Sequence, residues 1–285
     1  MPAIKHILLP LDFSAAGTAA IPYVRALANQ FHAKLSMLSV VPPAWIAPPG
    51  IIVSPASTDP EAIQETLQEH LDKVAMEGLE SPPVRITSVG DPALKIAEFT
   101  RDNAVDLVMM PTHGHGLFRR LLLGSVTSKV LHDVQCPVWT AAHAEKQHAQ
   151  ELPRKILCAL DADGKSAALV RWVVDFSRQA GASLQLLHVV RPVSDWQALA
   201  SEQELQEQLR TGARTYIESS LQSEGLDVPL RVAVGEIVPT ITEEATQEGA
   251  DLIVLGRGAL HETFGDLRSH VRAIIQRSPC PVLSV

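Results

Sequence analysis

Apolar and polar positions in the first half of the chain follow two patterns. Short, nearly continuous apolar runs at 7–11 and 35–41 predict strands that are covered on both faces. Between such runs, apolar residues recur every three or four positions, which predicts helices that pack on the strands. The same patterns predict further strands at 84–89, 107–110 and 138–141, and helices at 60–79, 93–103 and about 125–132.

A further helix follows the first strand, with the apolar positions Ala20, Val24, Leu27, Ala28 and Phe31 on one side. Ser14 stands where its side chain can cap the helix that follows the first strand. Pro22 falls inside the same helical pattern, so it predicts a kink or a late start. In the helix at 93–103, the apolar residues Leu94, Ile96, Ala97 and Phe99 are expected to face mostly inward.

The order of these elements favours a doubly wound sheet. Five strands joined by helical crossovers predict parallel pairing. In such sheets ligands bind at the carboxyl ends of strands, where the strand order reverses. Asp12, Val40 and the segment 111–114 all lie at carboxyl ends, so we expect them to gather at one crevice.

The chain repeats one unit twice. Residues 5–43 match residues 154–192 at a constant offset of 149, and V-D-L-V-M-M at 105–110 matches A-D-L-I-V-L at 250–255. Both copies close on C-P-V. The predicted organisation is a first domain at 1–143, a linker at 144–153 and a second domain at 154–285.

Composition narrows the class of protein. With 285 residues and 46% hydrophobic content the chain is globular and large enough for two domains. Its aromatic content is 4%, so the core must be built mainly from aliphatic residues. The net charge of −8 argues against nucleic acid as a main partner, because such partners require a basic face.

The number of cysteines and the hydropathy of the chain indicate the cellular compartment in which the protein works. Cys136, Cys158 and Cys280 are too few and too scattered for a disulfide framework or a zinc site, so we expect buried thiols. No apolar run approaches the roughly 18 residues that cross a bilayer, which predicts no membrane partner. The N-terminus lacks a secretory apolar core, because Asp12 interrupts it. These features favour a soluble, cytoplasmic protein.

The segment 105–140 holds the leading candidate for an anion site. Gly114 and Gly124 bracket nine residues, and the loop leads into a helix that begins with Ser125 and Thr127 near its start. Glycine allows the backbone to approach a ligand closely. Free amides at a helix N-terminus, together with the helix dipole, attract phosphate. Such a loop also serves plain turn geometry, so by itself it does not identify a ligand.

Three stretches resemble one known family. They are L-L-P-L-D-F-S near the start, V-V-P after the second strand, and T-H-G-x9-G-S-V followed by C-P-V. In this order and spacing the sequence resembles the universal stress proteins across nearly its whole length. The resemblance implies two tandem Rossmann-like domains of the adenine nucleotide α-hydrolase-like type, each a five-stranded parallel sheet flanked by helices. It also implies that strands 138–141 and 282–285 pair and make a pseudo-dimer, with a further homodimer left open.

The family's signature, G-x-x-G-x9-G-[S/T], implies an ATP site in the first domain. Through the resemblance, Asp12 would hold polar groups of the adenine or ribose and Val40 would meet adenine through its backbone. Pro111 stands at the first glycine position, where it removes an amide and fixes φ. The implied nucleotide-binding residues are Pro10, Asp12, Val40, Met110, Pro111, His113, Gly114, Gly124, Ser125 and Val126.

The second copy departs further from that signature. Its L-G-R-G at 255–258 is one residue shorter than M-P-T-H-G, and Arg268 stands where the first copy has Gly124. An arginine blocks close backbone approach, although its guanidinium can itself meet an anion. The second domain is therefore expected to lack a family-type ATP site and to pair with the first as a scaffold, with a different ligand as the alternative.

Metal and catalytic chemistry receive little support. His113 and His115 are imidazoles in the loop, but no third ligand accompanies them, so no resident metal is expected. A Mg²⁺ ion would arrive with ATP and be held by phosphates, water and Asp12. The sequence lacks G-x-S-x-G and G-x-x-x-x-G-K-[S/T], so no catalytic residues are assigned and at most slow ATP hydrolysis is expected.

Two functions remain open. One is a stress-response module that binds an adenine nucleotide in the first domain and signals through shape or partner choice. The other is a stress-response scaffold that needs no ligand. Pro111 discriminates between them, because a spoiled pocket would favour the scaffold.

Overall fold

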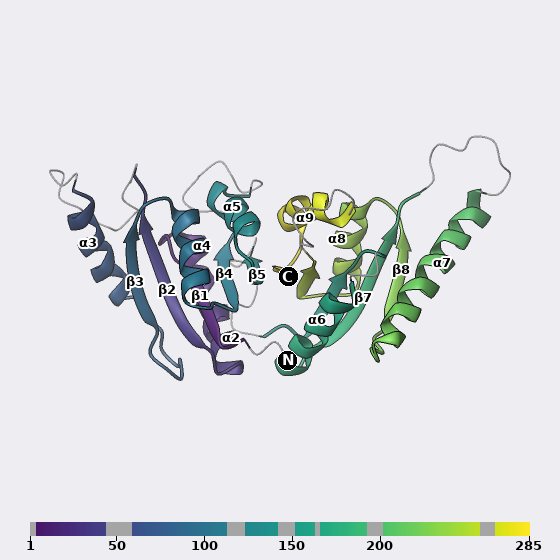
Figure 1. Cartoon of the computed structure of the whole chain (residues 1–285), viewed down its shortest axis with the longest axis horizontal. Coiled ribbons are helices and arrows are strands. Elements are labelled where there is room, and N and C mark those ends of the chain that lie inside the picture. Colours follow the sequence, from purple (N-terminus) through teal and green to yellow (C-terminus); the bar gives the residue numbers. More distant parts are fainter. Residues whose placement is uncertain are drawn as a thin grey trace. The chain divides into compact units, whose positions relative to one another are not determined.

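The computed structural model describes residues 4–43, 59–112, 123–141, 152–162, 166–192, 202–256 and 266–285. The chain forms two compact units that divide between Leu152 and Pro153 (Figure 1). Each unit has its own sheet and its own core. The predicted linker at 144–153 lies mostly outside the described residues, and its limits stay a prediction.

The N-terminal unit is a parallel sheet with helical crossovers. Its elements are β1 (His6–Pro10), α1 (Ala15–Ala19), α2 (Ile21–Gln30), β2 (Lys34–Val41), α3 (Pro60–Asp72), β3 (Val84–Val89), α4 (Pro92–Asp102), β4 (Leu107–Pro111), α5 (Ser125–Asp133) and β5 (Val138–Ala141). The strands lie in the order β3-β2-β1-β4-β5, and every pair is parallel. The chain therefore builds outward from β1 to β3 and then returns to the other side of β1. The order reverses between β1 and β4, which is where such sheets bind ligands.

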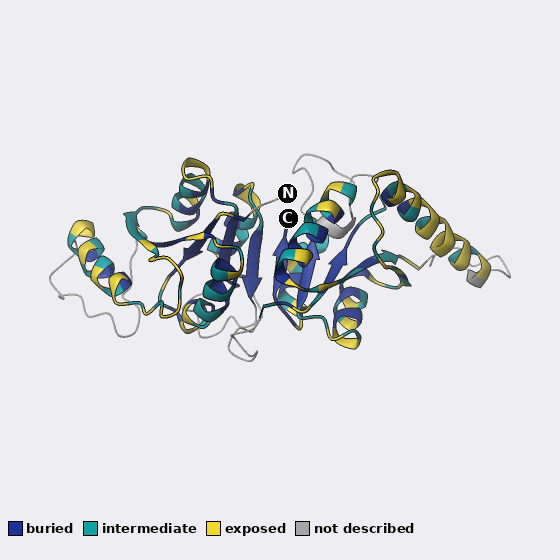
Figure 2. Ribbon diagram, turned by 90° about the horizontal axis from the view of Figure 1, so that it is seen from below, coloured by how far each residue is buried: buried dark blue, intermediate teal, exposed yellow. Residues whose placement is uncertain are grey.

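The central strands are buried along their whole length. All five residues of β1 and all five of β4 are buried. Figure 2 shows the inner strands of the units in the dark blue of buried residues. Leu8 and Val108 of these neighbouring strands pack with Ile96 of α4 and Val130 of α5. Each such side chain contributes about 1.5–3 kcal/mol relative to exposure. This core holds the carboxyl ends of β1 and β4 in fixed positions.

The first helix begins directly after Ser14, in agreement with the predicted cap, and the helical pattern is interrupted at Ala20, ahead of Pro22. The Ser14 hydroxyl accepts a hydrogen bond from the Gly17 amide at 3.0 Å, which caps α1. A second helix, α2, begins at Ile21, and Pro22 lies in its first turn, where a missing amide costs nothing.

Two expectations about helices were wrong. Helix α3 ends at Asp72 rather than 79, because the Arg85 guanidinium of β3 donates to the carbonyls of Leu71 (3.0 Å) and Val74 (2.8 Å) and closes the helix end there. Leu94 is 55% exposed and faces solvent from the first turn of α4. The buried face of that helix consists of Ala93, Ile96 and Thr100.

The C-terminal unit repeats the architecture. Its elements are β6 (Lys155–Ala159), α6 (Ser166–Ala180), β7 (Ser183–Val190), α7 (Glu202–Ser223), β8 (Leu230–Val234), α8 (Ile237–Gln247), β9 (Leu252–Leu255), α9 (Asp266–Arg277) and β10 (Val282–Ser284). Its strands lie in the order β10-β9-β6-β7-β8, again in parallel.

The two sheets share one register at their centres. Ile7 pairs with Leu107 in the first sheet, and Ile156 pairs with Leu252 in the second. Each sheet also has an aspartate, Asp106 or Asp251, that accepts the amides of the two residues leading into β1 or β6. The predicted repeat and the predicted α/β fold are confirmed. The pairing of strands 138–141 and 282–285 concerns the junction of the units and stays a prediction.

Candidate functional site

The end of β1 places a carboxylate at the point where the strand order reverses. The Leu11 amide donates to the Leu38 carbonyl at 2.9 Å and continues the pairing with β2. Phe13 then adopts a positive φ of 59°, and the chain turns into α1. The Asp12 carboxylate accepts the Ser14 amide at 3.0 Å, which fixes its direction, while the residue itself is exposed. Asp12 is therefore an oriented carboxyl group at the end of the strand.

Gly17 makes this position of Asp12 possible. A Cβ atom on Gly17 would lie 2.9 Å from the Asp12 Oδ1 atom and 3.3 Å from the Ser14 hydroxyl. A side chain there would push the carboxylate away from the helix start. The sequence alone does not indicate Gly17, because its role depends on the folded turn between the strand and α1.

The end of β2 turns main-chain groups toward the same place. Since the Leu38 carbonyl bonds to β1 and the Val41 carbonyl accepts the Gly90 amide beside β3, the main chain of Val40 faces the β1 side. The β1 strand has already ended at this level. The amide and carbonyl of Val40 thus lie on the β1 side, beyond the last residue of that strand.

The end of β4 contains Pro111 as an ordinary strand residue. Met110 pairs with Thr140 and Pro111 with Ala141 of β5. The Val108 amide donates to a carbonyl on the β5 side, so by alternation the Pro111 nitrogen faces away from β5. The proline therefore removes no hydrogen bond from the β4–β5 ladder.

Two hydrogen bonds join the end of β4 to the start of α5. The Gly124 amide donates to the Thr112 carbonyl at 2.8 Å. The Thr127 hydroxyl donates to the Pro111 carbonyl at 3.1 Å, in a buried position. They bring together the two ends of the loop 113–122, which itself lies outside the described residues, as do His113 and Gly114.

The first turn of α5 offers free donors beside this junction. Gly124 is the N-cap residue, with φ −60° and ψ 150°, and it has no side-chain cap. Amides in the first turn of a helix have no acceptor within the helix, and they carry the positive end of its dipole. Ser125 is exposed and Val126 half-buried, so their amides lie near the surface. The Gly124 amide is already bonded to Thr112, and Thr127 is buried, so Ser125 and Val126 are the remaining donors near the surface.

The comparisons with known proteins decide the family. The model of the universal stress protein family matches residues 3–141 and again residues 153–285. The chain belongs to this family.

Relatives of this universal stress protein include single-domain and two-domain proteins. A universal stress protein of Methanocaldococcus jannaschii is 32% identical over 149 residues, which are 50% of this chain and 85% of that protein. One of Mycolicibacterium smegmatis is 25% identical over 287 residues and is matched along both chains, at 98% and 96%. The crystal structure of a universal stress protein from Archaeoglobus fulgidus has a TM-score of 0.63 at 20% identity, covering 100% of this chain and 97% of that one.

The second universal stress domain differs at the corresponding strand ends. By the shared register, Gly256 follows β9 at the position of Pro111, and a Cβ atom there would lie 3.1 Å from the Leu169 side chain. The Ser166 hydroxyl donates to the Asp161 carbonyl at 2.6 Å. The side chain of Arg268 lies outside the described part, so the predicted loss of the motif there stays a prediction.

The described residues of this universal stress protein offer no candidate metal site. Within the described ranges, no group of three or more His, Cys, Asp or Glu side chains is placed to hold a metal ion. Cys158 and Cys280 are buried, as expected, whereas Cys136 is half-buried. Among the described helices, none is long and apolar enough to cross a membrane.

Proposed function

We propose that the N-terminal domain binds an adenine nucleotide, with ATP as the ligand, at the carboxyl ends of β1, β2 and β4. The observation that carries the proposal is the junction of β4 and α5 through Thr112–Gly124 and Pro111–Thr127. It holds the free donors of a helix start at the point where the strand order reverses.

The phosphates would lie against the first turn of α5. The amides of Ser125 and Val126 and the Ser125 hydroxyl are the donors there. Gly124 would let the phosphates come close to the main chain but would donate no hydrogen bond to them, because its amide is bonded to the Thr112 carbonyl. His113 and Gly114 belong to the same proposed set through the family motif.

The adenosine part would lie over β1 and β2. Asp12 would accept hydrogen bonds from ribose or adenine, since its carboxylate is oriented by the Ser14 amide. Val40 would meet the base through its main chain, and Pro10 and Met110 would form the apolar floor. A Mg²⁺ ion brought by ATP would suit the exposed Asp12 carboxylate, because oxygen ligands are those it prefers.

The proposal is a nucleotide-responsive binding module of the stress response and not an enzyme. The sequence lacks the motifs G-x-S-x-G and G-x-x-x-x-G-K-[S/T], so we assign no catalytic residue. Slow hydrolysis is the most that we expect. The scaffold alternative is favoured by one observation, the proline in place of the first glycine of the signature.

The experiment is ATP titration by calorimetry, preceded by mass spectrometry of nucleotides that co-purify with the full chain. Gly124→Arg carries the residue of the second copy into the first, and we expect at least a tenfold loss of affinity, about 1.4 kcal/mol. Gly212→Arg is the matched control, because nothing lies within 4 Å of a Cβ at this helical glycine. Equal affinity in wild type and Gly124→Arg would remove the site assignment. Absence of ATP binding in all three proteins would favour the alternative function, a scaffold that needs no ligand.

A further inference from the structure

Strand β8 is an edge of the C-terminal sheet. It pairs with β7 along one side and ends the strand order. The Gly235 amide donates to the Val190 carbonyl at 3.0 Å, so the main-chain groups two and four residues earlier also face β7. By alternation, those of Leu230, Val232 and Val234 face outward.

Two of these three outward positions are open. Arg214 of α7 donates to the Leu230 carbonyl at 3.3 Å and occupies the first position. In the part of the chain that the structure describes, nothing bonds to the outward groups of Val232 or Val234. Val234 is also 40% exposed. An added strand would find two successive hydrogen-bonding positions there.

The edge of the first sheet is closed at its centre. Gln64 of α3 donates to the outward carbonyl of Thr87, the middle position of β3, at 3.1 Å. Gln64 lies seven residues before the buried Leu71, and Arg214 lies seven residues before the buried Leu221. The two capping residues thus have the same helical position but bond to different positions of their strands.

The edges of β3 and β8 differ in which strand residue has its outward carbonyl bonded by the neighbouring helix. Thr87 and Val232 each precede a Val-Gly pair by two residues, so they are equivalent. In β3 this central position is occupied, whereas in β8 the cap has moved to Leu230. The open part of β8 is a specific feature of the second domain.

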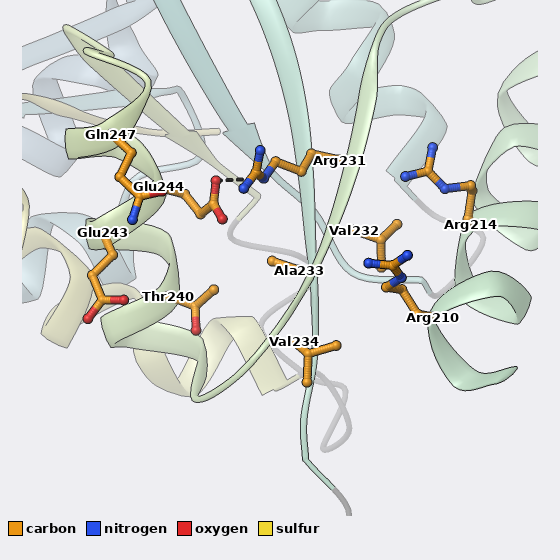
Figure 3. A pocket seen from close by; sticks show the side chains of 10 residues that line it. All are labelled: Arg210, Arg214, Arg231, Val232, Ala233, Val234, Thr240, Glu243, Glu244 and Gln247. Atoms are coloured by element: carbon orange, nitrogen blue, oxygen red, sulfur yellow. Dashed lines mark ion pairs between the residues drawn. The ribbon is translucent and has the colours of Figure 1, made fainter. Parts of the chain in front are cut away.

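A groove of about 520 Å³ follows the open edge. Figure 3 shows Arg210 and Arg214 of α7 on one side of β8 and Thr240, Glu243 and Glu244 of α8 on the other. The two walls therefore differ in charge.

The groups on the walls are not equally available. Arg231 forms an ion pair with the buried Glu244 at 2.7 Å and belongs to the wall itself. Arg210 and Arg214 pair with glutamates of their own helix, at 3.0 and 3.4 Å, with side chains nearly half exposed. Exposed pairs of this kind contribute little, so the Arg210 guanidinium can turn to an incoming carboxylate, whereas Arg214 keeps its Nη1 atom on the Leu230 carbonyl and offers its Nη2 atom.

We propose that this groove docks an extended peptide segment of a partner protein, which adds a strand beside β8. Side chains of a strand alternate between its two faces. The segment would therefore carry acidic residues at alternate positions facing Arg210 and Arg214, and a basic residue between them facing Glu243. Main-chain bonds to Val232 and Val234 supply attachment, and the two charged walls supply specificity. The proposal is independent of the nucleotide site in the first domain.

The test uses the full chain and a labelled pentapeptide, acetyl-Thr-Glu-Lys-Glu-Thr-amide, titrated by fluorescence anisotropy. We expect saturable binding, and binding at least about tenfold weaker for the charge-inverted peptide Thr-Lys-Glu-Lys-Thr. Two further peptides carry N-methyl groups on one or the other set of alternate amides. Because one edge of an added strand faces β8, one of them should lose binding and the other should keep it.

Two variants test the contacts on the protein. Arg210→Glu should weaken binding about tenfold, while Arg101→Glu, an equal charge change at an exposed arginine of the first domain, should leave it within about twofold. Val234→Pro removes an outward amide without touching the β7 ladder and should also abolish binding. Circular dichroism melts verify that the variants stay folded.

Several results would overturn the proposal. They are absence of peptide binding, equal binding of the charge-inverted peptide, or a Val234→Pro variant that binds like wild type. Free glutamate that competes as well as the peptide would make the groove a small-anion site. Self-association in sedimentation velocity that disappears in Val234→Pro would make the occupant a second copy of the chain.

Discussion

The Thr127 hydroxyl donates to the Pro111 carbonyl across 3.1 Å, and this bond joins the first turn of α5 to the last residue of β4. Both residues are buried, and Thr127 is 3% exposed. A buried carbonyl that loses its partner costs about 1–3 kcal/mol. The bond therefore stabilises the strand–helix junction on which the proposed phosphate site depends.

Replacing this threonine by its isostere tests the junction. We expect Thr127→Val to lower the free energy of unfolding by about 1–3 kcal/mol, because the Pro111 carbonyl is left without a donor. We also expect weaker ATP binding, since the helix start is no longer fixed. Thr127→Ser keeps the hydroxyl and is the control. Urea denaturation and calorimetry measure both quantities, and equal losses in the two variants would contradict the assigned bond.

Pro111 can be tested with a pair of substitutions. Pro111→Ala restores the amide, and Pro111→Gly restores both the amide and the room of the family's signature. One regained hydrogen bond is worth about 0.5–1.5 kcal/mol, so we expect ATP affinity to rise about three- to tenfold in both variants. Each should lose up to about 1 kcal/mol of stability, because the unfolded chain gains freedom. A gain of ATP affinity in the glycine variant alone would show that the missing side chain, and not the amide, matters for the approach of the ligand. Unchanged ATP affinity in both variants would place Pro111 outside the site.

His6 predicts a pH dependence of stability. Its Nδ1 atom lies 3.0 Å from the Asn103 carbonyl and its Nε2 atom 2.8 Å from the Ser36 hydroxyl. Burial lowers the pKa of His6 below its ordinary value of 6.5, although the Asn103 carbonyl acts in the opposite direction. The folded protein therefore binds this proton less readily than the unfolded chain. The contribution of neutral His6 to the free energy of unfolding is therefore complete above pH 6.5, and it is lost as the pH falls from 6.5 through the lowered pKa.

Denaturation of wild type and His6→Gln between pH 8 and pH 5 measures this effect. We expect the wild type to lose stability on acidification more steeply than the variant, and the difference between them to narrow below about pH 6.5. His132→Gln, at an exposed position, is the control and should follow the wild type. Parallel curves for wild type and His6→Gln would contradict the assignment.

The cysteines predict a simple labelling pattern. Burial raises the pKa of the Cys158 and Cys280 thiols to about 12, whereas Cys136 is half-buried. The thiolate is the reactive species. We expect a disulfide reagent at pH 8 to label one thiol in the native chain and three in urea. Peptide mapping should place the native label on Cys136, and fast labelling of either other cysteine would disprove the burial.

The sequence predicted the strands well, because a strand covered on both faces leaves a local and continuous apolar run. The limits of α3 could not be predicted in this way. That helix ends where the Arg85 side chain of a later strand reaches its carbonyls. Leu94 fits the helical spacing, yet it faces solvent, since the direction of α4 over the sheet decides which side is inward.

The candidate site was predictable where it depends on short motifs. Asp12, Pro111 and Gly124 follow from the strand ends and the glycine spacing. The contributions of Thr112 and Gly17 were not predictable. The Thr112 carbonyl accepts the Gly124 amide only because folding brings together the two ends of the loop after β4. Gly17 matters only because the Asp12 carboxylate lies close to the start of α1 in the folded chain.

The closed edge of β3 limits what copies of this chain can build. Growth of a fibre by edge-to-edge pairing of sheets requires two open strand edges on every copy, so that each copy can pair with two others. Gln64 interrupts the middle of the β3 edge, while the open part of β8 covers two positions. The open β8 edge of one copy therefore finds no equally open β3 edge on another copy, and edge-to-edge growth is hindered. We expect this protein to resist fibrillar aggregation, and Gln64→Ala to reduce that resistance.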